Sequence, residues 1–244
     1  MPIDIRQFAD SAALASAAAR DWLNWLNQAQ QRPGNAPICV ALSGGRITRD
    51  FFQETVRQFQ SNPAQPSAAQ GLFKNVHFFW ADERCVPPTD PESNYALARK
   101  LLFEPLAIPA AQIHRLRGET DEPRALAEAV SEITNLSQKV DGPPVFDLIF
   151  LGMGEDGHTA SLFPGESNDA ISNPAVYRAV TAVKPPPRRV TLGYGALLAA
   201  REIWALVSGN GKEAAFRQSL SSQSTPFGRI LQRRSSSTVY TDIK

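Results

Sequence analysis

The stretch VFDLIFLGMGEDGH, from Val145 to His158, joins an apolar run to a turn with three glycines. Its first nine residues predict a buried strand, because they are rich in β-branched and aromatic residues and follow the breaker GPP. Gly152, Gly154 and Gly157 then give the pattern G-x-G-x-x-G. Such glycines either form a dinucleotide-binding turn or let the backbone bend sharply and present His158.

The residues that follow disfavour a dinucleotide site. That site needs a helix to continue from the glycines, but Pro164-Gly165 arrives seven residues after Gly157. No strand that ends in an acidic residue follows about 20 residues later. We therefore predict that the turn holds Asp156 and His158 above the strand end. Histidine titrates near neutral pH, so His158 is a candidate general base.

Strand-like and helix-like segments alternate on both sides of this stretch. Strands rich in β-branched and aromatic residues, separated by helices, predict an α/β fold: an open, mostly parallel sheet with helices on both faces, in a Rossmann-like three-layer sandwich. The sequence has no internal repeat, which favours a single domain over residues 1–244. Strands are expected at 38–42, 76–81, 145–153, 175–183, 202–209 and 237–243, helices at 8–31, 49–59, 94–103, 122–139, 191–200 and 211–220, and a loop at 62–71.

Composition disfavours nucleic-acid and membrane partners. Lys and Arg total 25 against 24 Asp and Glu, a formal charge of +1. No apolar run approaches the ~18 residues that span a bilayer, and the first residues lack a signal-peptide pattern. Cys39 and Cys85 are expected to be buried free thiols of a reducing compartment, although two lone cysteines could pair. We therefore expect a cytoplasmic protein.

Four turns should meet at the carboxyl edge of the predicted sheet, where open α/β sheets bind ligands. In LSGGRIT, a strand, two glycines and a helix start can cradle an anion, with charge from Arg46; an ordinary strand-to-helix turn is the alternative. Lys212 falls in the first turn of a predicted helix, where a cation is unfavourable unless an anion is near. The four turns are Ser43–Gly45, Asp82–Arg84, Gly152–His158 and Gly209–Lys212.

Metal and covalent catalysis are disfavoured. Three scattered histidines and two distant cysteines do not give zinc-ligand spacing. Neither Ser43 nor Ser161 lies in G-x-S-x-G. His77, inside a predicted strand, and His114, in a connection, are expected to be structural.

Taken together, these segments resemble the 6-phosphogluconolactonase family, in the superfamily shared with glucosamine-6-phosphate deaminase/isomerase. The resemblance runs from about Ala41 to Lys212 and is most specific in GMGEDGHTASLFPG. It is supported by WADERCVPPTDPESNY, RRVTL and SGNGKEAAF. The deaminases are less similar, since they carry a DEY-like triplet in place of DER and a GHIAFNEP-like segment in place of GHTASLFP.

The resemblance implies cofactor-independent hydrolysis of 6-phosphoglucono-1,5-lactone to 6-phosphogluconate in the oxidative pentose phosphate pathway. It implies that His158 takes a proton from the attacking water. Asp156 would orient His158 or the sugar hydroxyls, and Arg84 would bind substrate and stabilise charge near the reacting carbonyl. The phosphate would be held by Ser43, Gly44 and Gly45, with Lys212 and Arg189 as charged partners.

Two departures from the family pattern leave alternatives open. The first turn reads LSGGRIT where the family has LSGGSTP, so Arg46 replaces a small hydroxyl residue and can compensate by its charge. The stretch TLGYGALLAA departs from a TLT-like stretch of the family. After KPPP, either Arg188 or Arg189 could point toward the interior of the protein. An amino sugar phosphate isomerase or deaminase and a non-catalytic phosphosugar-binding protein remain alternatives. We expect no metal or other cofactor, and a monomer.

Overall fold

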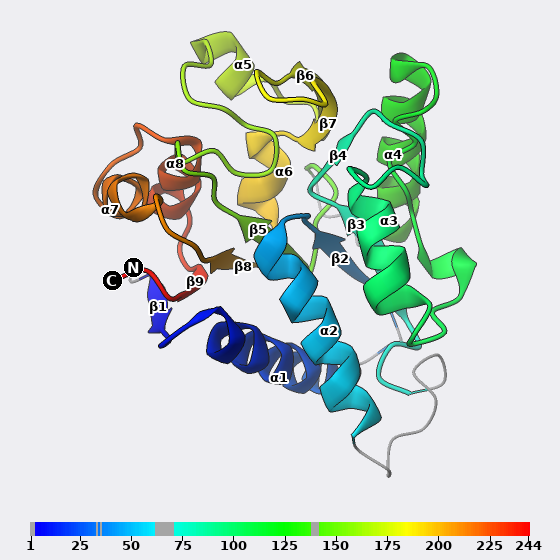
Figure 1. Ribbon diagram of the computed structural model, residues 1–244. Helices are drawn as coiled ribbons and strands as arrows, with labels where there is room; N and C mark the ends of the chain where they lie inside the picture. Colours follow the sequence, from blue (N-terminus) through cyan, green and yellow to red (C-terminus); the bar gives the residue numbers. More distant parts are fainter. Residues whose placement is uncertain (1–2, 33, 35, 62–70, 138–141) are drawn as a thin grey trace.

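A six-stranded parallel sheet forms the centre of the molecule in the computed structural model, which describes residues 3–32, 34, 36–61, 71–137 and 142–244 (Figure 1). The strand order is β1-β9-β8-β5-β2-β3. The predicted loop at 62–71 and the end of the predicted helix 122–139 fall outside the described residues, except for Gly71. The strands are β1 (Asp4–Gln7), β2 (Ile38–Leu42), β3 (Val76–Trp80), β5 (Leu148–Gly152), β8 (Glu202–Val207) and β9 (Thr238–Thr241).

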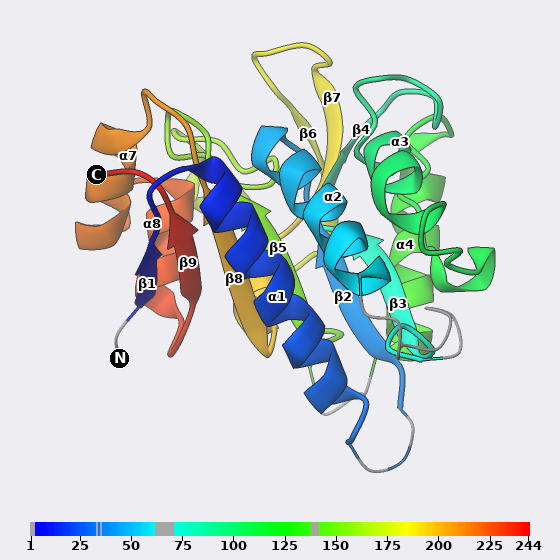
Figure 2. The ribbon, with the colours of Figure 1, turned by 60° about the horizontal axis from the view of Figure 1, so that its bottom comes forward.

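Helices cover both faces of this sheet, as predicted. Helices α1 (Ser11–Ala29) and α2 (Arg46–Gln60) lie side by side across one face (Figure 2). Helices α4 (Glu122–Leu136), α6 (Tyr194–Ala199) and α8 (Pro226–Arg233) lie on the other side. The three-layer α/β prediction is confirmed.

The core between the first face and the sheet is built around Trp22. Its ring centroid lies 5.3 Å from those of Phe51 and Phe150, which belong to α2 and β5. All five residues of β2 are buried, because helices cover a central parallel strand on both faces. This buried strand ends with Leu42 at the carboxyl edge of the parallel sheet.

A second, three-stranded antiparallel sheet stands over that edge and was not predicted. It consists of β4 (Asp82–Arg84), β7 (Arg188–Leu192) and β6 (Tyr177–Thr181) in the order β4-β7-β6. Residues 82–84 were predicted to form a turn, and a helix was expected to begin at Thr191. That helix begins only at Tyr194, because Thr191 pairs in register with Asp82 and Arg178 on the two neighbouring strands.

The remaining elements fall close to the predicted ranges, with three additions. α3 (Asn94–Ala98) continues as a π-helical turn to Phe103, within the predicted 94–103, and α7 spans Glu213–Ser221. Strand β1, the short α5 (Asn168–Ser172) and α8 were not predicted. A signal for α8 was present, since Thr225 caps its first turn by accepting the Gly228 N–H, and Pro226 occupies the first helical position.

The two cysteines are free thiols, as expected. Cys39 is buried and Cys85 is half-buried. Over the described ranges, no helix is long and apolar enough to cross a bilayer.

His77, on the edge strand β3, forms a hydrogen-bonded pair with His114, which lies in a later connecting segment. Nδ1 of His77 lies 2.9 Å from Nε2 of His114, and Nδ1 of His114 lies 2.9 Å from a carboxylate oxygen of Glu132. Because the carboxylate only accepts, the His114 proton belongs on Nδ1, and Nε2 accepts from His77. Both rings are therefore hydrogen-bonded within the fold, which fits a structural role.

We expect this pair to make stability depend on pH between about 4 and 6.5. Burial first, and His114 second, lower the pKa of His77 from 6.5 to about 4. Over this range the unfolded chain binds a proton that the folded protein excludes. The free energy of unfolding therefore rises with pH, by up to about 3 kcal/mol at 1.36 kcal/mol per unit.

Denaturant titrations at several pH values measure this slope. His77→Gln, which keeps a donor for His114 but does not titrate, should flatten it. An unchanged slope in this variant would assign the dependence to other groups.

Candidate active site

The carboxyl ends of the parallel strands and the second sheet enclose a cleft, here called the edge cleft. All four turns predicted to converge contribute to its lining. Neither His77 nor His114, the structural histidine pair, lines this cleft. Of the predicted site residues, Ser43, Gly44, Gly45, Arg46, Arg84, His158, Arg189 and Lys212 line it, and Asp156 lies directly beside His158.

The glycine turn after β5 fixes the position of His158. Gly154 donates its N–H to the His158 carbonyl, and Gly157 adopts a φ of 78°, a left-handed conformation that favours glycine. A Cβ on Gly154 would lie 2.1 Å from Nδ1 of the imidazole, so only glycine allows the ring this close. No helix continues from Gly157, which agrees with rejecting the dinucleotide interpretation.

His158 and Asp156 form an acid–imidazole pair. Nδ1 of His158 lies 2.5 Å from Oδ1 of Asp156, which also accepts the His158 backbone N–H at 3.1 Å. Burial raises the pKa of Asp156, but these contacts outweigh burial and leave the pKa below its ordinary value. An ionised Asp156 keeps the imidazole hydrogen on Nδ1, which leaves Nε2 able to accept a proton. The ring packs against Phe163, 5.2 Å between centroids.

The Ser43–Gly45 turn leads into α2 at one end of the edge cleft. The Ser43 hydroxyl donates to the Phe150 carbonyl at 2.8 Å and so ties β2 to β5. A Cβ on Gly44 would lie 1.9 Å from the Asn94 side-chain oxygen. Gly45 caps α2 with a φ of 113° and without a side-chain hydrogen bond. The first N–H groups of the helix are therefore not capped by a side chain, as an anion site requires.

Lys212 lies at a second helix start beside this turn. It occupies the N-cap position of α7 and makes no side-chain capping bond. Burial and then the nearby Arg46 guanidinium lower the pKa of Lys212, against the influence of Glu155 and Asp242. Two cations and two helix N-termini thus meet at one end of the edge cleft, a strongly anion-attracting arrangement.

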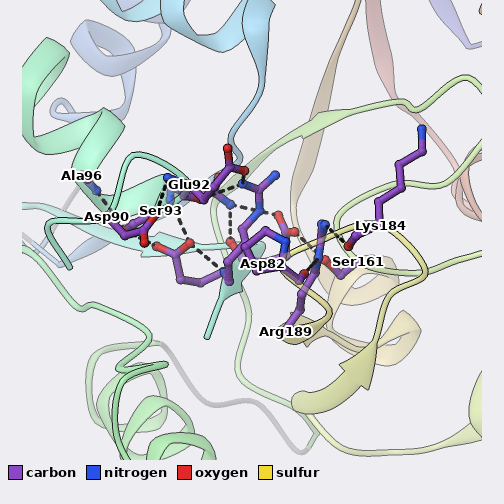
Figure 3. A network of polar contacts seen from close by, with 12 residues as sticks. Asp82, Asp90, Glu92, Ser93, Ala96, Ser161, Lys184 and Arg189 are labelled. Carbon is purple, nitrogen blue, oxygen red and sulfur yellow. Dashed lines mark hydrogen bonds and ion pairs between the residues drawn. The ribbon is translucent and has the colours of Figure 1, made fainter. Parts of the chain in front are cut away.

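A polar network around Asp82 joins β4 to α3 and to the segment that contains Ser161, beside the cleft (Figure 3). Asp82 is 5% exposed and accepts the Ser161 hydroxyl at 2.6 Å, while its carbonyl accepts the Asn94 amide at 2.8 Å. No local sequence pattern connects these residues, because Ser161 and Asp82 lie far apart in the chain.

The neighbouring Glu83 has a structural role. It accepts the backbone N–H groups of Arg84, Asn94 and Tyr95 and the Ser93 hydroxyl, and so anchors the start of α3. Burial raises the pKa of Glu83 to about 7, against four hydrogen bonds that favour its ionised form.

Arg84 and Arg189 face each other at the other end of the edge cleft. They are direct partners in the antiparallel pairing of β4 with β7. Arg189 is 7% exposed and lies over the Phe163 ring, 5.9 Å from its centroid. The preceding Arg188 is exposed and contacts Glu122 at 3.7 Å. Of the two arginines left open by the sequence, Arg189 is the one that lines the cleft.

No group of three or more His, Cys, Asp or Glu side chains that could hold a metal occurs within the described part of the chain.

Residues 9–240 match the family model described as glucosamine-6-phosphate isomerases/6-phosphogluconolactonase. The chain belongs to this family. Within it, a 6-phosphogluconolactonase of Haemophilus influenzae is 40% identical over 180 residues, which cover 73% of this chain and 71% of that protein. A 6-phosphogluconolactonase of Mycobacterium tuberculosis is 35% identical over 223 residues, covering 88% and 85%.

Among solved structures, the family fold extends over nearly the whole chain. The crystal structure of a devB protein superposes with a TM-score of 0.83 at 31% identity, covering 98% of this chain and 96% of that one. The antiparallel sheet and the edge cleft thus belong to a region in which this chain aligns with its relatives.

Proposed function

We propose that this protein hydrolyses 6-phosphoglucono-1,5-lactone to 6-phosphogluconate. The observation that carries the proposal is the Asp156–His158 pair, set in the same cleft as two pairs of cations in a chain of this family. A lactone is an activated ester, so its hydrolysis needs one positioned base and donors for the developing oxyanion. A phosphate far from the carbonyl supplies binding energy that fixes the reacting geometry.

In the proposed mechanism, Nε2 of His158 removes a proton from water as the water oxygen attacks the lactone carbonyl. Asp156 accepts a hydrogen bond from the Nδ1–H and stabilises the imidazolium that forms. Arg84 stabilises the oxyanion of the tetrahedral intermediate. The bond from the carbonyl carbon to the ring oxygen then breaks, and the imidazolium returns its proton to the departing ring oxygen. This sequence needs no cofactor and no covalent intermediate.

The substrate phosphate is assigned to the end of the cleft where α2 and α7 begin. The Ser43–Gly45 turn supplies uncapped helix N–H groups, and Arg46 and Lys212 supply charge. Arg46, the departure from the family pattern, takes the place of the missing hydroxyl residue. Arg189, which the family resemblance grouped with the phosphate, lies opposite Arg84 on the neighbouring strand, and we assign it to the carbonyl end of the substrate.

Removing either cation at the phosphate end should weaken substrate binding more than catalysis. We expect Lys212→Ala and Arg46→Ser each to raise KM for the phosphorylated lactone by roughly 10–100-fold, with little change in kcat, because a charge-assisted hydrogen bond is worth about 1.5–3 kcal/mol. Initial rates over a range of substrate concentrations measure both constants.

The non-phosphorylated lactone is the control, since its KM should not respond to these substitutions. It should also be a poor substrate of the unaltered protein. Equal turnover of both lactones would remove the case for a phosphate site.

Initial-rate hydrolysis, corrected for the spontaneous reaction, tests the proposed activity itself. Ammonia release from glucosamine 6-phosphate would instead favour the deaminase alternative, which the family description includes. Arg84 stands in the cleft where the deaminase pattern has tyrosine, which argues for the lactonase. Tight 6-phosphogluconate binding without any rate increase would favour the non-catalytic alternative.

We also propose that the chain acts as a cytoplasmic monomer whose ligand is the phosphosugar lactone, without a nucleic-acid or membrane partner. The nearly balanced formal charge of +1 supports the absence of a polyanionic partner. Sedimentation velocity at micromolar concentration would test the oligomeric state.

A further inference from the structure

The paired arginines at the far end of the edge cleft bring two like charges together. Arg84 and Arg189 are directly opposed on neighbouring antiparallel strands, a position where like charges are destabilising. Burial and then the Arg84 charge lower the pKa of Arg189. An arrangement that is unfavourable in the free protein becomes favourable when an anion lies between the two guanidinium groups.

Both guanidinium groups retain unused donors. Arg84 donates through NH1 to the Glu92 carbonyl at 2.6 Å, but its buried Nε meets no acceptor on any residue that the structure describes. Arg189 donates through Nε to the Pro186 carbonyl and through NH2 to the Lys184 carbonyl, which leaves NH1. A buried N–H without an acceptor destabilises the free protein, so these donors favour a ligand that accepts a hydrogen bond.

Neighbouring carboxylates do not occupy these donors. Asp82 and Glu92 both lie close enough to raise the pKa of Arg189. However, Asp82 accepts from Ser161, and Glu92 contacts only NH1 of Arg84, at 3.4 Å. The free donors of the pair are therefore not neutralised by a bidentate acid.

We propose that Arg84 and Arg189 form a second anion subsite that binds the carboxylate of 6-phosphogluconate, so that the product binds more tightly than the lactone. The inference rests on the proposed function, which places the substrate phosphate at Arg46 and Lys212. Hydrolysis converts a neutral lactone carbonyl beside His158 into a carboxylate. The product thus has an anion at each end, and the cleft has a pair of cations at each end. The reaction product is then an inhibitor, as is any phosphosugar acid of similar length.

Two ligands that differ only in the carboxylate test this directly. Calorimetric titration would compare 6-phosphogluconate with glucitol 6-phosphate, in which CH₂OH replaces the carboxylate. We expect 6-phosphogluconate to bind at least tenfold more tightly to the unaltered protein. In Arg84→Gln and Arg189→Lys, this ratio should fall to about twofold or less. Equal affinities in the unaltered protein, or the same ratio in both variants, would overturn the proposal.

The ratio of the two affinities distinguishes loss of carboxylate recognition from a general structural disturbance of the site. Arg189 also holds the Lys184–Pro186 segment, so a structural disturbance would weaken both ligands alike and leave the ratio unchanged. Arg46→Ser should weaken both ligands and preserve the ratio. The matched control is Arg188→Gln on the same strand, which should change neither affinity. Since the titration needs no turnover, a protein without lactonase activity would refute the proposed function while the carboxylate ratio still decides this proposal.

Discussion

His158→Ala should lose about 10²–10⁴-fold in the rate of enzymatic lactone hydrolysis, the usual contribution of a positioned general base. Among the described residues that line the edge cleft, no other group is held by an acid in a way that frees one nitrogen to take the water proton. The phosphate end is untouched, so 6-phosphogluconate should still bind. Initial rates corrected for spontaneous hydrolysis, together with circular dichroism, measure the loss and confirm the fold.

The matched control is His114→Gln, which removes an imidazole that is also bonded to a carboxylate but lies outside the cleft. Its activity should stay within about twofold of the unaltered protein. Full activity in His158→Ala would refute the role given to this residue, whatever the control shows.

Gly154→Ala should reduce kcat by roughly 10–100-fold without removing any functional group. The new Cβ would lie 2.1 Å from Nδ1 and Cε1 of the His158 ring and 2.9 Å from a carboxylate oxygen of Asp156. The ring must move away and its bond to Asp156 must lengthen, and a displacement of about 1 Å can cost about 10²-fold. The pH–rate profile and kcat measure the effect.

Gly195→Ala is the corresponding control, since a Cβ there meets no atom within 4 Å. It lies in α6 outside the cleft lining and should leave kcat unchanged while adding about 0.5–1 kcal/mol of stability. Normal kcat in Gly154→Ala would show that the imidazole does not depend on this close packing.

Much of the fold could be predicted because its central strands are locally distinctive. The apolar runs at 38–42 and 145–153 are bounded by glycine or proline and are too short for helices, so a buried parallel sheet followed from them. β1 was missed because its four residues DIRQ include two charged ones, Asp4 and Arg6, and are mostly exposed. β4 was missed because three residues beside a proline-rich segment give no periodic signal, and their pairing with β7 is set by tertiary contacts.

The candidate site was predictable where its functional residues lie together in one turn. It was not predictable where residues far apart in the sequence meet through strand pairing. The glycines around His158 predicted a bend in the backbone. The close approach of Asp156 to His158 follows from their separation by two residues in this turn. The opposition of Arg84 and Arg189 needs the register of two strands about a hundred residues apart, which no local pattern encodes. The same register decides between Arg188 and Arg189, because neighbouring residues of a strand point to opposite faces.

The cations of the edge cleft come from four elements: Arg46 begins α2, Arg84 ends β4, Arg189 lies in β7 and Lys212 caps α7. No fragment with only one of the two sheets can assemble all four. A phosphorylated sugar acid should therefore bind tightly only to completely folded molecules. Its binding stabilises the folded protein by RT ln(1 + [L]/Kd), and this stabilisation should be lost in any partly unfolded state in which the small sheet has detached. The ligand can thus serve as a quantitative reporter of native assembly during refolding.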